Sequence, residues 1–597
     1  MEPSRWPERA ALPAAVAGTL AVIAVVFYYP VATVFAEAVL DAGRLTLDPL
    51  LSVLGDPFYT GVVHHLFVDP AGVPAGVLAW ADAGAPPVEF GLFGFTAYQA
   101  ALSALASVAL GLPGAYVLAR YDFRGRETVR SLTIVPFVLP SILVAVGFLA
   151  MFGQTGVLND LLGAVGLGPV EVVFTLEAIV LAHAFYNAPL VIRLVATAWE
   201  SVDRRQVETA RAMGASPLRA FLDVVVPAIR PALLTAALLT FVFTFLSFPI
   251  VLALGGLELA TVEVWVFARV QALDLSEAAT LATLETLVSL VLMYLYLRYE
   301  SRQRATTGAG QPLPRKPLAT GWATLRSPVR LALAGYGAVA AVVFLGPLVS
   351  LLLESVTAPD GSFTTAYYEF LLTQQASTAA GTARPLPAVL NSLVYGAGTL
   401  LLAVPMGVVV AVVATRGGRG SRLAETVLSA PLAVSGIVVG LGLLQTMVFG
   451  TVLFGYRLTA AGPVAVVFAH AAAAYPFVTR NVAPALGGLD SRYRDAARSL
   501  GASRLRALLD VELRLVATAV LAGAAFAFAI SVGEFDSTVL LAEGTDSYTM
   551  PVALERYVGN RSLGPNLGPA TAMGTVLLAV TGLSFVAIDR LGGRWEP

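Results

Sequence analysis

Two of the four histidines, His183 and His470, lie within long apolar stretches of the chain. An imidazole in such a place can carry a proton, bind a metal or hydrogen-bond a neighbouring helix. The chain contains no cysteine, and no acidic residue accompanies either histidine at the spacing of metal ligands. We therefore expect hydrogen bonds between helices, with a place in a pathway or gate as the alternative. The sequence predicts no metal site and no cofactor.

The single lysine excludes one kind of nucleotide chemistry. Lys316 stands in LPRKPL, whereas a phosphate-binding loop requires G-x-x-x-x-G-K-[ST]. The chain also lacks a nucleophile and base at a spacing that would indicate an intramembrane hydrolase. We expect a protein that is not an enzyme, and any ATP that drives it must be hydrolysed by another subunit.

The composition is that of an integral membrane protein. Of the 597 residues, 57% are hydrophobic and only 13% are charged, and the mean hydropathy is +0.78. Soluble domains carry about twice this charged fraction. The net charge of −2 gives no indication of nucleic-acid binding, so the expected surroundings are a lipid bilayer.

Twelve apolar stretches are predicted to cross the bilayer as helices, since a crossing takes about 20 residues. The first six are 10–36, 90–119, 131–159, 178–192, 231–257 and 278–297. The second six are 331–353, 385–415, 426–456, 458–479, 515–541 and 562–588. The expected fold class is therefore all-α, with twelve transmembrane helices.

The chain is a tandem duplication. Residues 203–227, DRRQVETARAMGASPLRAFLDVVVP, recur without a gap at 490–514 as DSRYRDAARSLGASRLRALLDVELR. A constant interval of 287 residues separates the two copies, and the same interval separates His183 from His470. We infer a first half (1–298), a linker (299–328) and a second half (329–597), each half with six helices.

The repeated segments, here named the first island (203–227) and the second island (490–514), are polar and lie between apolar stretches. Each predicts a short helix, a sharp turn and a second helix. Asp203 and Asp490 can cap the first helix of their islands. Gly214 and Gly501 can end it, because glycine accepts the left-handed conformation found at helix ends.

The islands resemble the EAA loop of ABC-importer permeases, with E-x-A-x-x-x-G, nine residues, and then apolar-x-apolar-Pro. The matching residues are Glu208, Ala210, Gly214 and Pro227 in the first island and Asp495, Ala497 and Gly501 in the second. Arg514 stands where the second proline is expected. The resemblance covers nearly the whole chain. It implies the type I importer fold and a role for the islands in coupling to an ATPase.

The function implied by this resemblance is that of the permease of a binding-protein-dependent ABC importer. Its expected partners are two copies of an ATPase subunit, docked at the two islands, and an extracytoplasmic solute-binding protein. The stretches LAHAFYNAPLVIRL and LSFPIVLALGG are most similar to thiamine permeases. Ferric iron or another small solute is the alternative cargo. An ion-coupled secondary transporter with parallel halves is the alternative class.

Acidic residues within apolar stretches are costly and mark candidate functional positions. Glu534 lies in the eleventh stretch and corresponds to Ser247 in the first half. We expect it to face outside water at a helix break, or else to line the pathway or to meet the solute-binding protein. The candidate pathway residues are His183, Ser247, Phe248, His470, Glu534 and Phe535. Glu285 has no acidic counterpart and is expected to contact another helix or water.

Arginines decide the expected orientation. The arginine-rich segments 120–130, 204–219, 298–316 and 416–422 fall on one side if every apolar stretch crosses once. Both termini, the linker and both islands are therefore predicted to be cytoplasmic in a cell (inner) membrane. The acidic segment 40–90, with the pair His64 and His65, would lie outside. The linker is rich in Arg, Gly, Thr and Pro and predicts a flexible tether.

Overall fold

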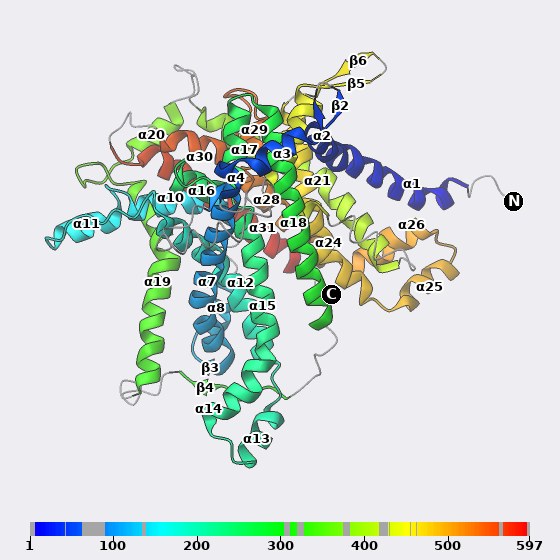
Figure 1. Ribbon diagram of the computed structural model, residues 1–597. Helices are drawn as coiled ribbons and strands as arrows, with labels where there is room; N and C mark the ends of the chain where they lie inside the picture. Colours follow the sequence, from blue (N-terminus) through cyan, green and yellow to red (C-terminus); the bar gives the residue numbers. More distant parts are fainter. Residues whose placement is uncertain are drawn as a thin grey trace, which may run out of the picture.

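The structure, a computed structural model, is almost entirely helical (Figure 1). It describes residues 6–41, 43–61, 90–133, 136, 139–303, 311–318, 327–373, 383–416, 428, 430–453, 455–460, 462–559 and 565–593. His64, His65 and most of the acidic segment fall outside the described residues.

The elements of the first half, with those of the linker, are α1 (Trp6–Ile23), α2 (Tyr29–Glu37), β1 (Leu40–Asp41), β2 (Arg44–Leu45), α3 (Asp48–Gly55), α4 (Pro57–Thr60), α7 (Gly91–Arg120), β3 (Tyr121–Asp122), α8 (Arg126–Leu132), α10 (Ser141–Phe152), α11 (Val157–Ala164), α12 (Leu176–Glu200), α13 (Arg204–Ala212), α14 (Pro217–Ala220), α15 (Val226–Phe245), α16 (Pro249–Gly255), α17 (Val262–Gln271), α18 (Leu275–Gln303) and β4 (Lys316–Pro317). Those of the second half are α19 (Pro328–Glu354), α20 (Ala366–Thr373), α21 (Pro385–Arg416), α23 (Gly436–Leu443), β5 (Thr451–Leu453), β6 (Tyr456–Leu458), α24 (Gly462–Gly487), α25 (Ser491–Ser499), α26 (Arg504–Ala507), α27 (Leu513–Leu515), α28 (Ala517–Gly533), α29 (Thr538–Leu541), α30 (Met550–Val558) and α31 (Gly568–Gly593).

Nine helices in the described ranges are long and apolar enough to cross a membrane, and a tenth is added if α26 to α28 count as one span bent by 82°. The other two predicted spans correspond to shorter apolar helices, Gly436–Val448 and Gly568–Ser584. The first of these is short because the hairpin of β5 and β6 occupies the end of the predicted stretch 426–456. Twelve spans are therefore not confirmed.

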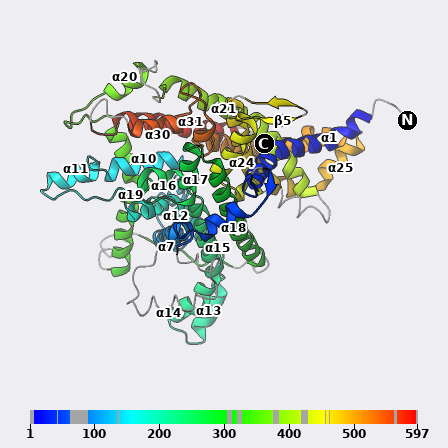
Figure 2. The same cartoon turned by 45° about the horizontal axis from the view of Figure 1, so that its top comes forward.

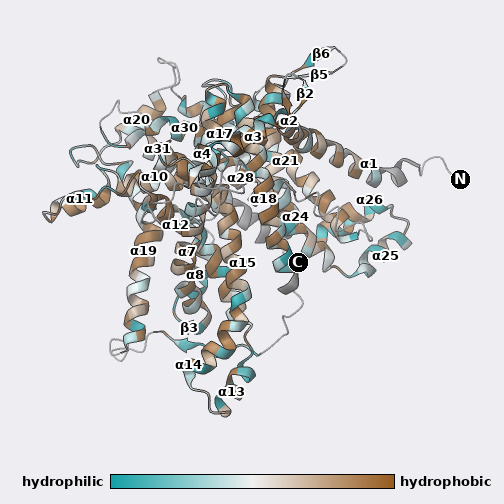
Figure 3. Ribbon diagram, in the orientation of Figure 1, coloured by the Kyte–Doolittle hydropathy of each residue, from teal (hydrophilic) through white to brown (hydrophobic). Residues whose placement is uncertain are grey.

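The outer helices present their apolar side chains to the surroundings, as a bilayer requires. The most apolar 18 residues of α19 have a mean hydropathy of 2.2, and only 17% of them are buried by the protein. Figure 3 shows the same apolar colouring along α15 and α19. Such faces are stable only in contact with lipid, so these helices belong to the membrane-facing exterior.

The two halves have equivalent bundles. α7 packs against α12 and α15, and α21 packs in the same way against α24 and α28. A hydrogen bond from a backbone N–H to a side-chain hydroxyl also recurs in the two halves. The backbone N–H of Val262 donates to Thr96 Oγ1 at 3.1 Å, and that of Met550 donates to Ser392 Oγ at 2.9 Å. In each half, the second predicted span thus holds the start of a short helix, α17 or α30.

The halves exchange their first helices. α2 packs against α23 of the second half, and α19 packs against α10 of the first half. Both contacts depend on glycine, because an added Cβ would approach the carbonyl oxygen of Pro347 to 3.0 Å at Gly147 and that of Pro30 to 2.5 Å at Gly442. The two halves are therefore interlocked.

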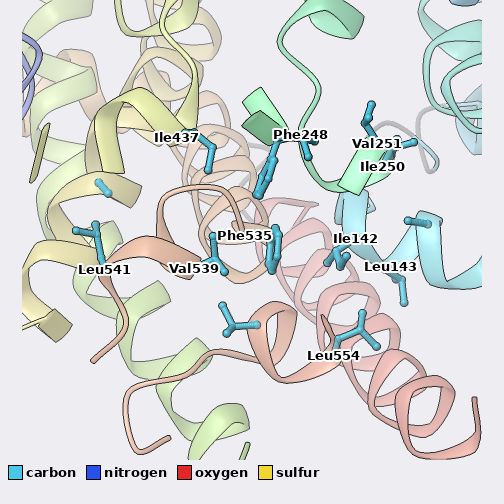
Figure 4. Packing of buried hydrophobic residues seen from close by; sticks show 14 of the residues in the cluster. Ile142, Leu143, Phe248, Ile250, Val251, Ile437, Phe535, Val539, Leu541 and Leu554 are labelled. Carbon is cyan, nitrogen blue, oxygen red and sulfur yellow. The ribbon is translucent and has the colours of Figure 1, made fainter. Parts of the chain in front are cut away.

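One continuous apolar core joins the halves. Buried residues of both halves meet in it, among them Ile142 and Phe248 from the first half and Ile437 and Phe535 from the second (Figure 4). From this core, α15 runs down to the first island at the bottom of the view, whereas α1 and α25 lie at its right (Figures 1 and 2). Each island lies at the far end of its own half.

The linker is not a free tether over residues 311–318, which corrects the expectation from composition. β4 pairs in parallel with β3, and the backbone N–H of Arg204 donates to the carbonyl of Gln311 at 2.8 Å. The Arg315 side chain reaches Glu200 at 3.1 Å. This part of the linker is therefore fixed to the first half beside the first island.

Candidate functional site

Both islands have the predicted local structure. Asp203 Oδ1 accepts a hydrogen bond from the backbone N–H of Arg205 at 3.0 Å, and Asp490 Oδ1 accepts one from that of Arg492 at 2.9 Å. These bonds cap α13 and α25. Gly214 and Gly501 follow with φ of +93° and +90°. An L-residue is strained at such angles, so the glycines set the direction in which each chain leaves its helix.

Charge strengthens the second cap. The side chain and then the backbone of Arg492 hydrogen-bond Asp490, and these bonds hold the pKa of the carboxyl below its ordinary value of 3.8. Because the folded pKa is lowered, the contribution of this cap to stability is complete above the unfolded pKa and is lost as the pH falls through the folded pKa. At neutral pH the cap is therefore fully formed.

The second helices are also equivalent, but their exits differ. Ser216 and Ser503 each cap a four-residue helix, with Oγ accepting from the backbone N–H three residues on at 3.2 Å. A π-helical turn follows in both islands. Pro227 then lies in the first turn of α15. In the second island, where Arg514 replaces it, the chain bends by 82° before α28. The two islands are unequal at this point.

The island surfaces carry apolar residues that the motif did not single out. No residue of α13 or α25 is buried. Met213 is 78% exposed and Leu500 is 90% exposed, and these two residues are equivalent in the repeat. A single exposed apolar side chain is ordinary, but its recurrence at the same position of both islands makes it a candidate contact for a partner. The 287-residue interval was the signal that could have found them.

The other motif residues lie on this surface. Glu208 forms an ion pair with Arg204 at 2.5 Å, and Asp495 lies 3.8 Å from Arg494. Exposed pairs of this kind contribute about 0–1 kcal/mol, so their charges remain available to a partner. Ala210 and Ala497 are both half-buried.

The two histidines are buried and hydrogen-bond across helices, which is the role expected first for them. In the first half, His183 Nδ1 lies 3.2 Å from Ser103 Oγ, and its Nε2 lies 2.9 Å from Ser247 Oγ. In the second half, His470 Nδ1 lies 2.8 Å from Ser531 Oγ. A role of either histidine in a pathway stays a prediction.

Glu534 makes the second network stronger. His470 Nε2 lies 3.0 Å from Glu534 Oε2, and the backbone N–H groups of Ser537 and Thr538 donate to the same carboxylate at 2.7 and 3.2 Å. The carboxylate thereby caps α29. A buried carboxylate needs such partners, which explains how a charge is tolerated at this depth.

Phe248 and Phe535 meet between the halves. They are 0% and 1% exposed, and their rings stack with centroids 5.6 Å apart and planes inclined by 16°. Figure 4 shows the pair in the shared apolar core. The structure thus brings the six predicted pathway residues into three contacts, His183 with Ser247, His470 with Glu534 and Phe248 with Phe535.

Glu285 is fully buried beside another glutamate that sequence reasoning missed. It is 1% exposed and neighbours Glu263, which is 0% exposed. Glu285 was expected to contact either another helix or water. Its burial beside a residue of α17 favours contact with another helix. Glu263 was missed because it lies in the short helix α17, outside the long apolar stretches.

Two helical halves with matching islands and a joint core define a membrane permease built by duplication. The chain belongs to the family of binding-protein-dependent transport system inner membrane components, which matches residues 111–303 and 403–595. It is thus the permease component of an ABC importer and a multi-pass inner membrane protein, and it is not an enzyme. This membership decides against the ion-coupled secondary transporter.

Several of its relatives have known cargo. The chain is 29% identical over 518 residues to the thiamine transport system permease protein ThiP of Escherichia coli (strain K12), covering 84% of this chain and 88% of that one. It is 28% identical over 493 residues to ThiP of Brucella abortus (strain 2308), covering 81% and 85%. The molybdenum transport system permease protein ModB of Azotobacter vinelandii is 33% identical over 207 residues, covering 34% of this chain and 90% of ModB. Membership of the family implies ATPase and solute-binding partners in general.

Proposed function

We propose that this permease imports thiamine. The observation that carries the proposal is the similarity to thiamine permeases over more than four-fifths of the chain, both halves included. ModB, which matches only 34% of the chain, offers much weaker support for its own cargo. Import of ferric iron by the same mechanism is the competing cargo.

We further propose that one ATPase subunit docks on each island. The support is the paired geometry, in which two capped helices end at a left-handed glycine and expose a large apolar residue, Met213 or Leu500. Closure of the two ATPase subunits on ATP would move the islands, and the interlocked halves would transmit this motion to the shared core. A ligand shifts such an equilibrium only through its different affinity for the two states.

The topology that goes with this proposal has twelve crossings, in two repeats of six, with both termini and both islands in the cytoplasm. The domain division at 299–328 belongs to the same proposal. Its support is the arginine-rich character of the island segments and linker.

Uptake of radiolabelled thiamine tests the cargo. Proteoliposomes would contain the chain, its ATPase subunits and its solute-binding protein, with ATP inside the compartment that the ATPase faces. The proposal expects ATP-dependent thiamine accumulation that unlabelled thiamine competes away and ferric iron does not. Accumulation of iron without thiamine would overturn it.

A further inference from the structure

A cavity of about 210 Å³ lies between the two halves, next to the stack of Phe248 and Phe535. Ser141 and Tyr186 line it from the first half. Phe477, Phe526, Glu534 and Asp536 line it from the second half. With Phe535, four aromatic rings and two acidic side chains therefore surround one space at the junction of the halves.

The two carboxylates are in different situations. Glu534 is engaged by His470 and by the backbone of α29. Asp536 makes no hydrogen bond or ion pair with any of the described residues, and it lies away from water near the acidic groups of Glu534 and Glu263. The cavity thus has one acidic group that is engaged by the protein and, among the described residues, one without a partner that a cation could complete.

The duplication supplies an internal comparison. Some buried residues are identical at equivalent positions of the two repeats. His183 corresponds to His470, and Phe248 corresponds to Phe535. The cavity residues differ. The repeat equivalents of Glu534, Asp536, Tyr186, Phe477 and Phe526 are Ser247, Pro249, Ala473, Leu190 and Leu239. The corresponding positions of the other repeat carry neither acids nor these rings, and that repeat still forms an equivalent helical bundle. Packing alone therefore does not require the acids and rings of the cavity.

We propose that this cavity is a transit site for a small organic cation. The positive charge lies against Asp536 and Glu534, and the ring or N-alkyl groups lie against Tyr186, Phe477 and Phe526. Aromatic faces attract cations, most strongly away from water. The volume is below the 300–1,000 Å³ of typical ligand pockets, so the site holds one substituted ring at a time. This inference rests on the proposed transport function.

An organic cation fits this lining better than a bare metal ion. Within the described parts of the chain, no group of three or more His, Cys, Asp or Glu side chains could hold a metal. The rings add apolar surface that a hydrated ion does not use. The chemistry of the site therefore favours a quaternary or delocalised nitrogen.

The absence of cysteine allows a direct test, because Ser141→Cys places a single thiol in the cavity. Two methanethiosulfonate reagents would label this thiol, one with a trimethylammonium group and one with a sulfonate group. The rate of each reagent would be divided by its rate with a free thiol in solution. A negatively charged cleft concentrates cations about tenfold or more, so the cationic reagent should be favoured by that factor. Asp536→Asn in the same background should reduce the preference severalfold.

The matched control is Asp160→Asn, the same change on the exposed α11. It should leave the preference unchanged. An equal preference in the Asp536 variant and its parent would overturn the proposal, and so would a thiol that neither reagent reaches.

Ligand protection separates this inference from the choice of cargo. N-Methylpyridinium should slow labelling of the Ser141→Cys thiol, and neutral nicotinamide should not. If N-methylpyridinium protects and thiamine neither protects nor is taken up, the cation site stands and the thiamine proposal is lost. If thiamine is taken up but no cation protects the thiol, the transit site is lost and the import function stands.

Discussion

Phe248 and Phe535 occupy the same position of the two repeats, and their rings stack on each other with centroids 5.6 Å apart. The contact therefore joins corresponding places in the two halves. Any motion that separates the halves at this level must therefore break the stack. We propose that the pair acts as a gate.

Replacement of either ring should make transport leaky. Phe248→Leu and Phe535→Leu keep an apolar side chain but lose the stack, which is worth about 0.5–1.5 kcal/mol beyond the buried area. We expect raised ATP hydrolysis without binding protein and faster passive thiamine efflux from proteoliposomes. A double-mutant cycle on thermal unfolding should return a coupling energy in the same range.

Phe241→Leu is the control, because Phe241 stacks on Phe245 within α15 and does not bridge the halves. An equal leak in that variant would show that ring loss anywhere loosens the protein.

Gly214→Val and Gly501→Val should each abolish uptake while the chain still inserts in the membrane. A β-branched residue at φ near +90° costs about 1–3 kcal/mol, and the chain relieves this by moving the second helix of the island. Capture of the ATPase subunit on an affinity column should fall in parallel.

The control is Gly335→Val in α19, where the φ is ordinary and an added Cβ meets no atom within 4 Å. This variant should retain uptake and ATPase capture. Normal uptake by the Gly214 or Gly501 variant would count against coupling through the islands.

His470→Ala should destabilise the protein more than His183→Ala. Loss of His470 removes a donor from the carboxylate of Glu534, whereas loss of His183 frees only the hydroxyls of Ser103 and Ser247. A buried polar group that loses its partner costs about 1–3 kcal/mol, and a charged group costs more than a neutral one. Thermal unfolding of the two variants in one detergent measures the difference.

Adding Glu534→Gln to His470→Ala should recover part of that loss, because the neutral amide needs less compensation. If His183→Ala proved equally damaging, the two networks would not differ in the way that the contacts indicate.

Cutting the linker should not separate the halves. A protease site inserted within residues 319–326 leaves 311–318 attached to the first half through β3 and Arg204. The exchanged helices α2 and α19 should then hold the fragments together through affinity purification in mild detergent.

Gly147→Leu combined with Gly442→Leu is the contrasting variant, because both glycines permit the exchanged contacts. Its cleaved fragments should separate. Separation of the fragments with both glycines intact would contradict the interlocked arrangement.

The sequence predicted what local rules and the repeat determine. The caps at Asp203 and Asp490 and the left-handed glycines follow from short-range backbone chemistry, and the constant interval made each copy support the other. The helical membrane class followed from composition. These features need no knowledge of which distant segments meet.

Long-range contacts were beyond the sequence. Nothing local indicates that Phe248 faces Phe535, or that Pro30 packs on Gly442. The fixed linker segment was missed because its composition is that of a tether and its partners lie in β3 and α13. Twelve spans stay a prediction, because hydropathy does not register the hairpin that shortens the helix after Gly436.

Because the halves exchange their first helices, some contacts of the first half can form only after the second half has been synthesised. Pro30 leaves the ribosome early, but its partner Gly442 does not exist until most of the polypeptide has been made. Gly147 likewise waits for Pro347. Until then α2 and α10 must be sheltered by lipid or by the insertion machinery, because contacts so distant along the chain form late. Joining both halves in one translation product guarantees that the awaited helix arrives in the same patch of membrane.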